Sequence, residues 1–99
     1  MAAKLVITGE AQADIVDALG PYERISAERG NHFLNCVQQC IDSIVGTPKM
    51  HSIILSPFRR AMIRGYPYAV FYMYENDVVS IHCVVHTSRD SSYWKRRLP

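Results

Sequence analysis

Arginine side chains are concentrated in the second half of the chain, among aromatic residues and a histidine. Residues 59–99 hold seven lysines and arginines against three acids, a balance of +4, whereas residues 1–58 hold four against six, a balance of −2. A guanidinium binds carboxylates and phosphates in a bidentate manner, so this asymmetry favours an anionic partner, either nucleic acid or an acidic protein surface. A solvated charged surface explains the count about as well. The candidate binding residues are Arg59, Arg60, Arg64, His86, Arg89, Tyr93, Trp94, Arg96 and Arg97.

Three of these side chains have the types needed for acid–base chemistry on a phosphodiester. A metal-free ribonuclease needs a base for the 2′-hydroxyl, an acid for the leaving oxygen and a cation for the phosphate. His86, Tyr93 and Arg89 could fill these roles. A histidine at the end of a strand can equally well cap that strand through a backbone hydrogen bond.

Neither a metal site nor a cofactor site is predicted. His82 and His86 lie four residues apart on an expected strand, about 13 Å, which is too far for two ligands on one zinc ion. The sequence contains no glycine-rich phosphate loop and no serine in a nucleophile elbow.

The C-terminal run from Tyr93 to Arg97 places a large aromatic side chain among cations. Tryptophan beside arginine is typical of the residues that dominate protein interfaces, so Trp94 is a candidate anchor for a protein partner. Packing of a terminal helix onto a sheet is the alternative for Trp94.

These residues must be positioned by a sheet that the sequence predicts over residues 58–86. Apolar residues alternate with more polar ones in three short runs, the period of strands with one face on a core. The segment Glu75-Asn76-Asp77 predicts a tight hairpin between the second and third strands. Connections this short make these strands antiparallel.

Two helices are expected before the sheet. Thr8 has the type of a helix N-cap and opens an apolar stripe that ends near Ile25, with a kink or break expected at Gly20-Pro21. A second helix is expected from about Gly30 to Val45. Residues 49–57 are predicted to be a loop whose Ile53-Ile54-Leu55 lies under the sheet, and residues 91–98 to be a short helix.

The sequence therefore predicts a single α+β domain over residues 1–99, with an N-terminal strand, an antiparallel helical hairpin packed on a small antiparallel sheet (β-α-α-β-β-β) and a short C-terminal helix. The alternation places Arg60 and Arg64 on the face opposite to Ala69. Cys36 and Cys40 are expected to be small buried hydrophobes. The hairpin residues expected to contact Phe71, Ile81 and Cys83 are Phe33, Val37, Ile41 and Ile44.

Composition supports a soluble globular domain, with 48% hydrophobic and 20% charged residues. No apolar run approaches the roughly 20 residues of a membrane span, and the N-terminus lacks the core of a signal peptide. Three cysteines, an odd number, fit reduced thiols. The expected compartment is the cytoplasm.

Motifs along nearly the whole chain resemble the RelE/ParE toxins of bacterial type II toxin–antitoxin systems. The matching residues of the expected helices are Ala13-Asp14-Ile15, Ala18, Tyr22-Glu23, Gly30, Phe33, Ile41, Ile44 and Pro48. Those of the sheet and tail are Arg59-Arg60, Pro67-Tyr68, Val70, Tyr72, Val85-His86, Arg89-Asp90, Trp94 and Arg97. The resemblance implies a small sheet packed on a helical hairpin, and a cognate antitoxin whose acidic, partly disordered tail folds over the toxin.

The resemblance is greater to the ParE branch than to the RelE branch. Pro67-Tyr68-Ala69-Val70 looks like the Pro-Tyr-x-Val of ParE toxins, which are associated with inhibition of DNA gyrase. RelE toxins cut mRNA on the ribosome with the help of an arginine at the position of Ala69 and a terminal tyrosine that Tyr93 matches. The sequence also departs from the family pattern at Pro21 and Ser91.

Three functions follow from the resemblance. The first is a ParE-like toxin that inhibits growth by binding DNA gyrase and needs only an interface. The second is a RelE-like, ribosome-dependent and metal-independent endoribonuclease. The third is an inactive member of the family that binds its antitoxin.

Overall fold

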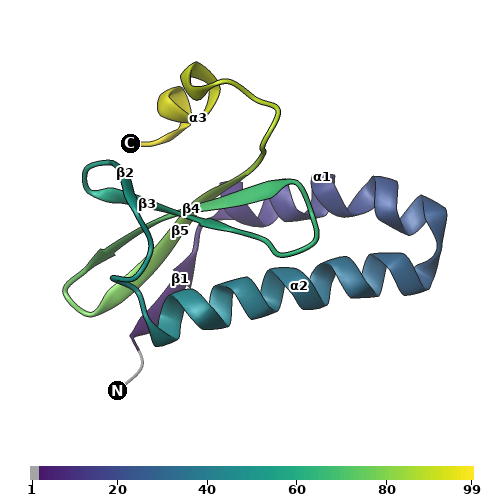
Figure 1. Cartoon of the computed structure of the whole chain (residues 1–99), viewed down its shortest axis with the longest axis horizontal. Helices are drawn as coiled ribbons and strands as arrows, with labels where there is room; N and C mark the ends of the chain where they lie inside the picture. Colours follow the sequence, from purple (N-terminus) through teal and green to yellow (C-terminus); the bar gives the residue numbers. More distant parts are fainter. Residues whose placement is uncertain (1–2) are drawn as a thin grey trace.

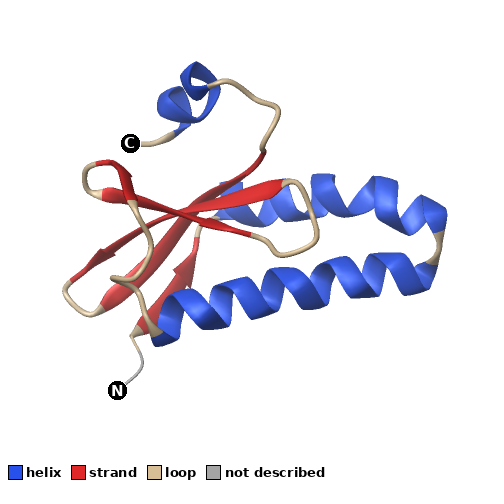
Figure 2. Cartoon of the chain, in the orientation of Figure 1, coloured by secondary structure: helices blue, strands red, loops and turns tan. Residues whose placement is uncertain are grey.

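The computed structural model describes residues 3–99 and shows a five-stranded sheet with helices on both faces (Figures 1 and 2). The strand order is β1-β5-β4-β3-β2, and only the β1–β5 pair is parallel. In chain order the elements are β1 (Lys4–Ile7), α1 (Gly9–Ile25), α2 (Ala27–Gly46), β2 (Ile53–Leu55), β3 (Phe58–Met62), β4 (Tyr68–Glu75), β5 (Val78–His86) and α3 (Ser91–Arg97).

The predicted architecture is confirmed, with one additional strand. The segment that was expected to be a loop under the sheet contains β2, which pairs with β3 at the sheet edge. Ile53 and Leu55 are exposed, and only Ile54 is partly buried, because an edge strand turns alternate side chains toward solvent. The expected hairpin between β4 and β5 is present, with Asn76 and Asp77 at positive φ.

The helical hairpin begins and turns at side-chain caps. The Thr8 hydroxyl accepts from the Ala11 backbone N–H at 3.1 Å, and the Ser26 hydroxyl accepts from that of Arg29 at 3.0 Å. Of the kink or break expected at Gly20-Pro21, the break is absent, because α1 continues through Pro21 to Ile25. Proline has no N–H to donate to the carbonyl of Asp17, four residues earlier, and Asp17 is exposed, so water can satisfy that carbonyl.

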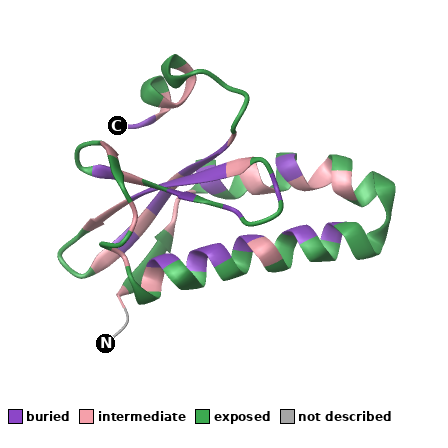
Figure 3. Cartoon of the chain, in the orientation of Figure 1, coloured by how far each residue is buried: buried purple, intermediate pink, exposed green. Residues whose placement is uncertain are grey.

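Each face of the sheet has its own apolar cluster. The hairpin core lies between the sheet and α1–α2, and the buried sides of the two helices face it (Figure 3). The α3 core lies on the other face, beneath α3. The fully buried or nearly buried residues of the hairpin core include Phe33, Val37, Ile41, Ile44, Val70, Tyr72, Val79 and Ile81. Those of the α3 core are Phe58, Ala69, Phe71, Cys83, Val85 and Leu98.

A bulge in β5 decides which residues face which core. Phe71 pairs with Cys83 and Tyr72 pairs with Ile81, so His82 is an extra residue in β5. Beyond the bulge, side chains on β5 change sides. Cys83 therefore lies in the α3 core, although Ile81, two residues earlier, lies in the hairpin core as expected. Phe71 also lies in the α3 core, because on β4 the alternate residues Val70 and Tyr72 are the ones that face the hairpin. The expectation that Phe71 and Cys83 contact the helical hairpin is wrong.

Two helix residues differ from their expected burial. Cys40 is buried, but Cys36 is only partly buried because it lies at the edge of the stripe that faces the sheet. Ile25, the last residue of the predicted apolar stripe, is 69% exposed because α1 extends beyond the sheet there. Within residues 3–99, none of the helices is both long and apolar enough to cross a membrane.

Candidate functional site: two clefts at the end of β5

A cleft of about 230 Å³ lies on the α3 side of the sheet, between the strands and the start of α3. We call it the basic cleft. Its polar groups come from three places: Arg60 on β3, His86 at the end of β5, and Thr87 and Arg89 in the turn that follows. Apolar side chains form the rest of the wall. The complete lining is Arg60, Met62, Ala69, Phe71, Val85, His86, Thr87, Arg89 and Trp94.

Arg60 shares this cleft with Ala69, which corrects the face assignment made from the sequence. In the β3–β4 ladder, Arg60 is opposite Phe71 and Met62 is opposite Ala69. Residues opposite each other in an antiparallel pair put their side chains on the same face, and alternate residues of a strand do so too. Arg60 therefore supplies a cation on the face of Ala69.

His86 ends β5 and has one ring nitrogen engaged. Its Nδ1 accepts a hydrogen bond from the Ser88 backbone N–H at 3.0 Å, and the ring lies edge-on to Tyr68 with the centroids 5.1 Å apart. A neutral imidazole that accepts at Nδ1 carries its proton on Nε2. In this state His86 is a hydrogen-bond donor at Nε2, which suits binding an anion.

Arg89 lies over the ring of Tyr93, with the guanidinium carbon 4.5 Å from the ring centroid. The guanidinium carbon of Arg97 lies 5.8 Å from the same centroid. Tyr93 thus interacts with two cations, which limits the positions that Arg89 adopts.

A second cleft of about 190 Å³ lies on the other face of the sheet, beside α1, and we call it the α1 cleft. His86, Arg89 and Val85 line both clefts, so the end of β5 forms the ridge between them. The two clefts differ in charge, because the α1 cleft has two aspartates and the basic cleft has no carboxylate among its lining residues. The lining of the α1 cleft is Asp14, Asp17, Ala18, Tyr68, Val84, Val85, His86, Arg89 and Tyr93.

Three of the predicted site residues, Arg59, Arg64 and Arg96, do not line the basic cleft. Arg59 donates to the carbonyl oxygens of Lys49 and His51, at 3.2 and 2.7 Å, and so holds the segment before β2. Arg64 lines a groove beside α2. Arg96 lines a third cleft near the start of α1.

Trp94 stacks on Phe71, with the ring centroids 5.0 Å apart and the planes 26° apart. It is partly buried against the α3 core and lines the basic cleft. The contact with Phe71 corresponds to the packing alternative for Trp94. Lys95 extends its amine over the same indole, 5.6 Å from the centroid.

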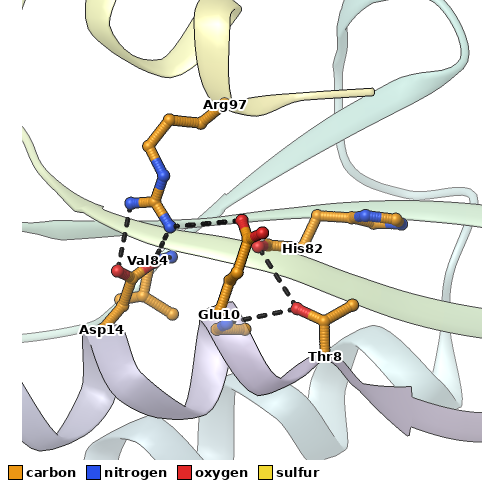
Figure 4. Close-up of polar contacts among 7 residues, drawn as sticks. Thr8, Glu10, Asp14, His82, Val84 and Arg97 are labelled. Atoms are coloured by element: carbon orange, nitrogen blue, oxygen red, sulfur yellow. Dashed lines mark hydrogen bonds and ion pairs between the residues drawn. The ribbon is translucent and has the colours of Figure 1, made fainter.

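Arg97 joins α3 to α1 through a bidentate ion pair with Asp14 (Figure 4). Its two terminal nitrogens lie 3.0 and 2.9 Å from the two carboxylate oxygens, and the exposed fractions of the Arg97 and Asp14 side chains are only 22% and 15%. The hydrogen bond to Asp14 raises the pKa of Arg97 above its usual value. Glu10 is a distant second partner at 4.0 Å, and its side chain is 75% exposed.

Asp14 was not among the predicted site residues. One oxygen also accepts from the backbone N–H of Val84 at 2.9 Å, just beyond the bulge. The sequence contains a signal for this role, since Asp14 falls between the buried residues Ala11 and Ala18 at helical spacing. An acid on a buried stripe needs a partner. The partner lies 83 residues away, and no local pattern identifies it.

Within residues 3–99, no three histidine, cysteine or acidic side chains gather into a potential metal site. No protein-family model matches the sequence, and no curated protein matches it.

Solved structures do share the fold. The chromosomal ParDE toxin–antitoxin system of P. aeruginosa matches with a TM-score of 0.64 and 13% identity, over 88% of this chain and 98% of that chain. The isolated E. coli RelE toxin matches with a TM-score of 0.60 and 13% identity, over 96% and 95%. A free-state E. coli RelE variant with two arginines changed to alanine gives 0.62 and 15%, over 99% and 100%.

The arrangement of a strand, a helical hairpin, an antiparallel sheet and a short terminal helix thus defines a small α+β domain. This chain has the fold of the RelE and ParE toxins. Structures from both branches match with similar scores, so the fold alone does not assign the chain to either.

Proposed function

We propose that the chain is the growth-inhibiting toxin of a type II toxin–antitoxin pair and that the basic cleft is its target-binding surface. The observation that carries this proposal is the convergence of Arg60, His86 and Arg89 on one cleft. The fold that surrounds the cleft is shared with solved ParE and RelE toxins. A toxin of this class acts in the cytoplasm and is neutralised by a cognate antitoxin.

For the target we propose DNA gyrase, bound through an acidic protein surface. The cleft offers two guanidiniums and the Nε2–H of His86, all of which donate to an anion. Its lining includes no carboxylate, and His86, which accepts a hydrogen bond at Nδ1, carries its proton on Nε2. Such a set binds anions, but it lacks a group ready to remove a proton from a 2′-hydroxyl. The resemblance of residues 67–70 to ParE toxins supports the same choice.

A ribosome-dependent endoribonuclease is the second candidate, and one observation favours it. Arg60 lies on the same face as Ala69, so the cleft has a cation despite the alanine at that strand position. Loss of one preorganised donor typically reduces the rate about 10²–10³-fold, so a substitute for the missing arginine is what a nuclease would require.

The experiment compares the two targets with the same purified protein. Inhibition of gyrase supercoiling without cleavage of mRNA on translating ribosomes is expected. Arg89→Ala should raise the concentration needed for half-maximal inhibition roughly tenfold, whereas Arg24→Ala, which changes an exposed arginine on α1, should leave it unchanged. Cleavage of mRNA without an effect on gyrase would overturn the gyrase proposal in favour of the nuclease.

Expression in cells tests the toxin assignment itself. Induction is expected to arrest growth, and co-expression of the product of the neighbouring gene should form a complex and restore growth. A chain that leaves growth, gyrase and ribosomes unaffected but still binds that product would be an inactive, antitoxin-binding member.

A further inference from the structure

We propose that Asp14 is a positioning residue for the basic cleft: by holding Arg97, it docks α3 and thereby fixes Tyr93 and Arg89 beside His86. This inference rests on the proposed function only for its consequence, target binding, and not for the docking itself. Asp14 lies on α1, on the far side of the ridge from the basic cleft, and it has no place in that cleft's lining.

The Asp14 carboxylate is held from two directions (Figure 4). Arg97 binds both of its oxygens, and the Val84 N–H binds one of them. Strand β1 pairs with β5 only up to Ile81, so the Val84 N–H lies beyond the end of β1. Asp14 therefore supplies the hydrogen-bond acceptor that β1 does not reach, and in doing so its own position is fixed by the sheet.

The contacts that begin with the Asp14–Arg97 ion pair, which we call the clamp, continue through Tyr93 to Arg89. Arg97 and Arg89 both lie against the Tyr93 ring, at 5.8 and 4.5 Å from its centroid. A displacement of Arg97 thus removes one neighbour of Tyr93, and a displacement of Tyr93 removes the surface on which Arg89 rests. The contacts form a continuous path from α1 to a cation at the mouth of the cleft.

Helix α3 needs such a clamp because it is short. It has seven residues, and helices of fewer than about 12 residues are marginal in water unless tertiary contacts hold them. Its other anchors are the stack of Trp94 on Phe71 and the buried Leu98. The Asp14–Arg97 pair is the anchor that ties α3 to the helical hairpin rather than to the sheet.

Trp94 is the only tryptophan in the chain, so its fluorescence reports the docking of α3 directly. In Asp14→Ala, the emission should shift to longer wavelength and quenching by acrylamide should increase, while the far-ultraviolet circular dichroism of the hairpin and sheet is retained. Arg97→Gln breaks the clamp from the other side and should give the same change. Asp17→Ala is the matched control, an exposed aspartate on the same helix and in the same cleft, and should behave as the wild type.

A double-mutant cycle on gyrase supercoiling separates positioning from general destabilisation. Arg89→Ala and Asp14→Ala should each raise the concentration for half-maximal inhibition roughly tenfold, and the double variant should also be roughly tenfold weaker rather than hundredfold. In the double variant Asp14→Ala/Arg60→Ala, the two losses of inhibition should multiply. Arg60 lies on β3, so its position does not depend on the contacts that run through α3.

The outcomes distinguish this inference from the proposed function. Unchanged Trp94 emission in both Asp14→Ala and Arg97→Gln would overturn the docking role. Multiplicative losses in the pair with Arg89 would overturn the positioning role even if the emission shifts. Wild-type protein that fails to inhibit gyrase overturns the proposed target, and the docking role is then decided by the fluorescence alone.

Discussion

The sheet is covered by the 38-residue α1–α2 hairpin on one face and by the seven-residue α3 on the other, and the two covers leave different surfaces. On the hairpin face, an aromatic group of Tyr22, Phe33 and Tyr66 interlocks, with ring centroids 4.9–5.0 Å apart. On the α3 face, the cover is too short to close the sheet, and arginines surround the gap. We therefore expect the hairpin face to provide most of the stability, and we propose the α3 face as the binding surface.

The two faces also differ in whether their polar side chains have hydrogen-bond partners within the protein. Tyr72 sits fully buried in the hairpin core, and its hydroxyl donates to the carbonyl of Pro48 at 2.7 Å. The Tyr66 hydroxyl is 2.6 Å from Nδ1 of His32. The guanidinium of Arg60, by contrast, belongs to an exposed residue on the α3 face. Polar groups in the hairpin core meet protein partners, whereas those of the basic cleft are open to a ligand.

The strongest test of this contrast is Phe33→Ala. Phe33 is fully buried in the hairpin core, and removing such a ring typically costs about 3–5 kcal/mol of unfolding free energy. Chemical denaturation should show this loss as a lower midpoint with an unchanged slope. Wild-type stability in this variant would mean that the hairpin face does not dominate the fold.

Trp94→Ala should have a smaller effect on stability, about 2 kcal/mol, because the indole is only partly buried. The loss should come mainly from the stack with Phe71, which belongs to the α3 core. Thermal denaturation of this variant beside Phe33→Ala tests the order of the two faces. A larger loss from Trp94→Ala than from Phe33→Ala would reverse the assignment of the stabilising face.

The sequence predicts the order of elements well but not their faces, and β4 and β5 show why. Ala69, Val70, Phe71 and Tyr72 are all buried, since both faces of this strand are covered. Period-2 alternation identifies a face only when the other face is solvated. The bulge at His82 also moves the later side chains of β5 to the opposite face of the sheet, and no residue type in β5 indicates this. Phe71 and Cys83 were therefore assigned to the wrong core.

The sequence predicts anion-binding side chains near the end of the sheet, but it identifies only some of the residues that line the candidate site. Arginine, histidine and tyrosine near the end of the sheet predict anion binding, and Arg60, His86 and Arg89 do line one cleft. The structural engagement of Arg59 and Arg97 could not be predicted, because their partners are backbone carbonyls in an irregular segment and an acid 83 residues away. Long-range pairs of this kind leave no local pattern.

Alkaline pH offers a test that involves both cores, because each contains a buried thiol. Burial raises the pKa of Cys83 to about 12 and that of Cys40 to about 11, from an ordinary value of 9.0. A raised pKa in the folded state means that folding favours the neutral thiol. The buried thiols therefore contribute fully to the stability of the fold below pH 9, and this contribution is lost between pH 9 and pH 12. The melting temperature should fall as the pH rises through this range.

Cysteine variants show which thiol is responsible for the alkaline loss. Cys83→Ala should flatten the dependence of melting temperature on pH, as should Cys40→Ala over a slightly narrower range. Cys36→Ala serves as the control, because this cysteine is partly exposed, and its profile should follow the wild type. Profiles that are equally steep in all three variants would show that other groups cause the alkaline loss.

The smallest expected effect on stability is that of Arg60→Ala, and it is the sharpest test of the division between the two faces. Arg60 is exposed, and surface substitutions usually change the unfolding free energy by less than about 0.5 kcal/mol. Its guanidinium nevertheless faces the basic cleft, so growth inhibition should be lost although the protein remains fully folded. Arg64→Ala is the matched control, since Arg64 follows the same strand but lines the groove beside α2 with Cys36 and Cys40. Growth assays and denaturation curves of the two variants should be measured side by side. If Arg64→Ala loses toxicity while Arg60→Ala keeps it, the binding surface lies on the hairpin side of the sheet. The contrast between a stabilising face and a binding face would then be wrong.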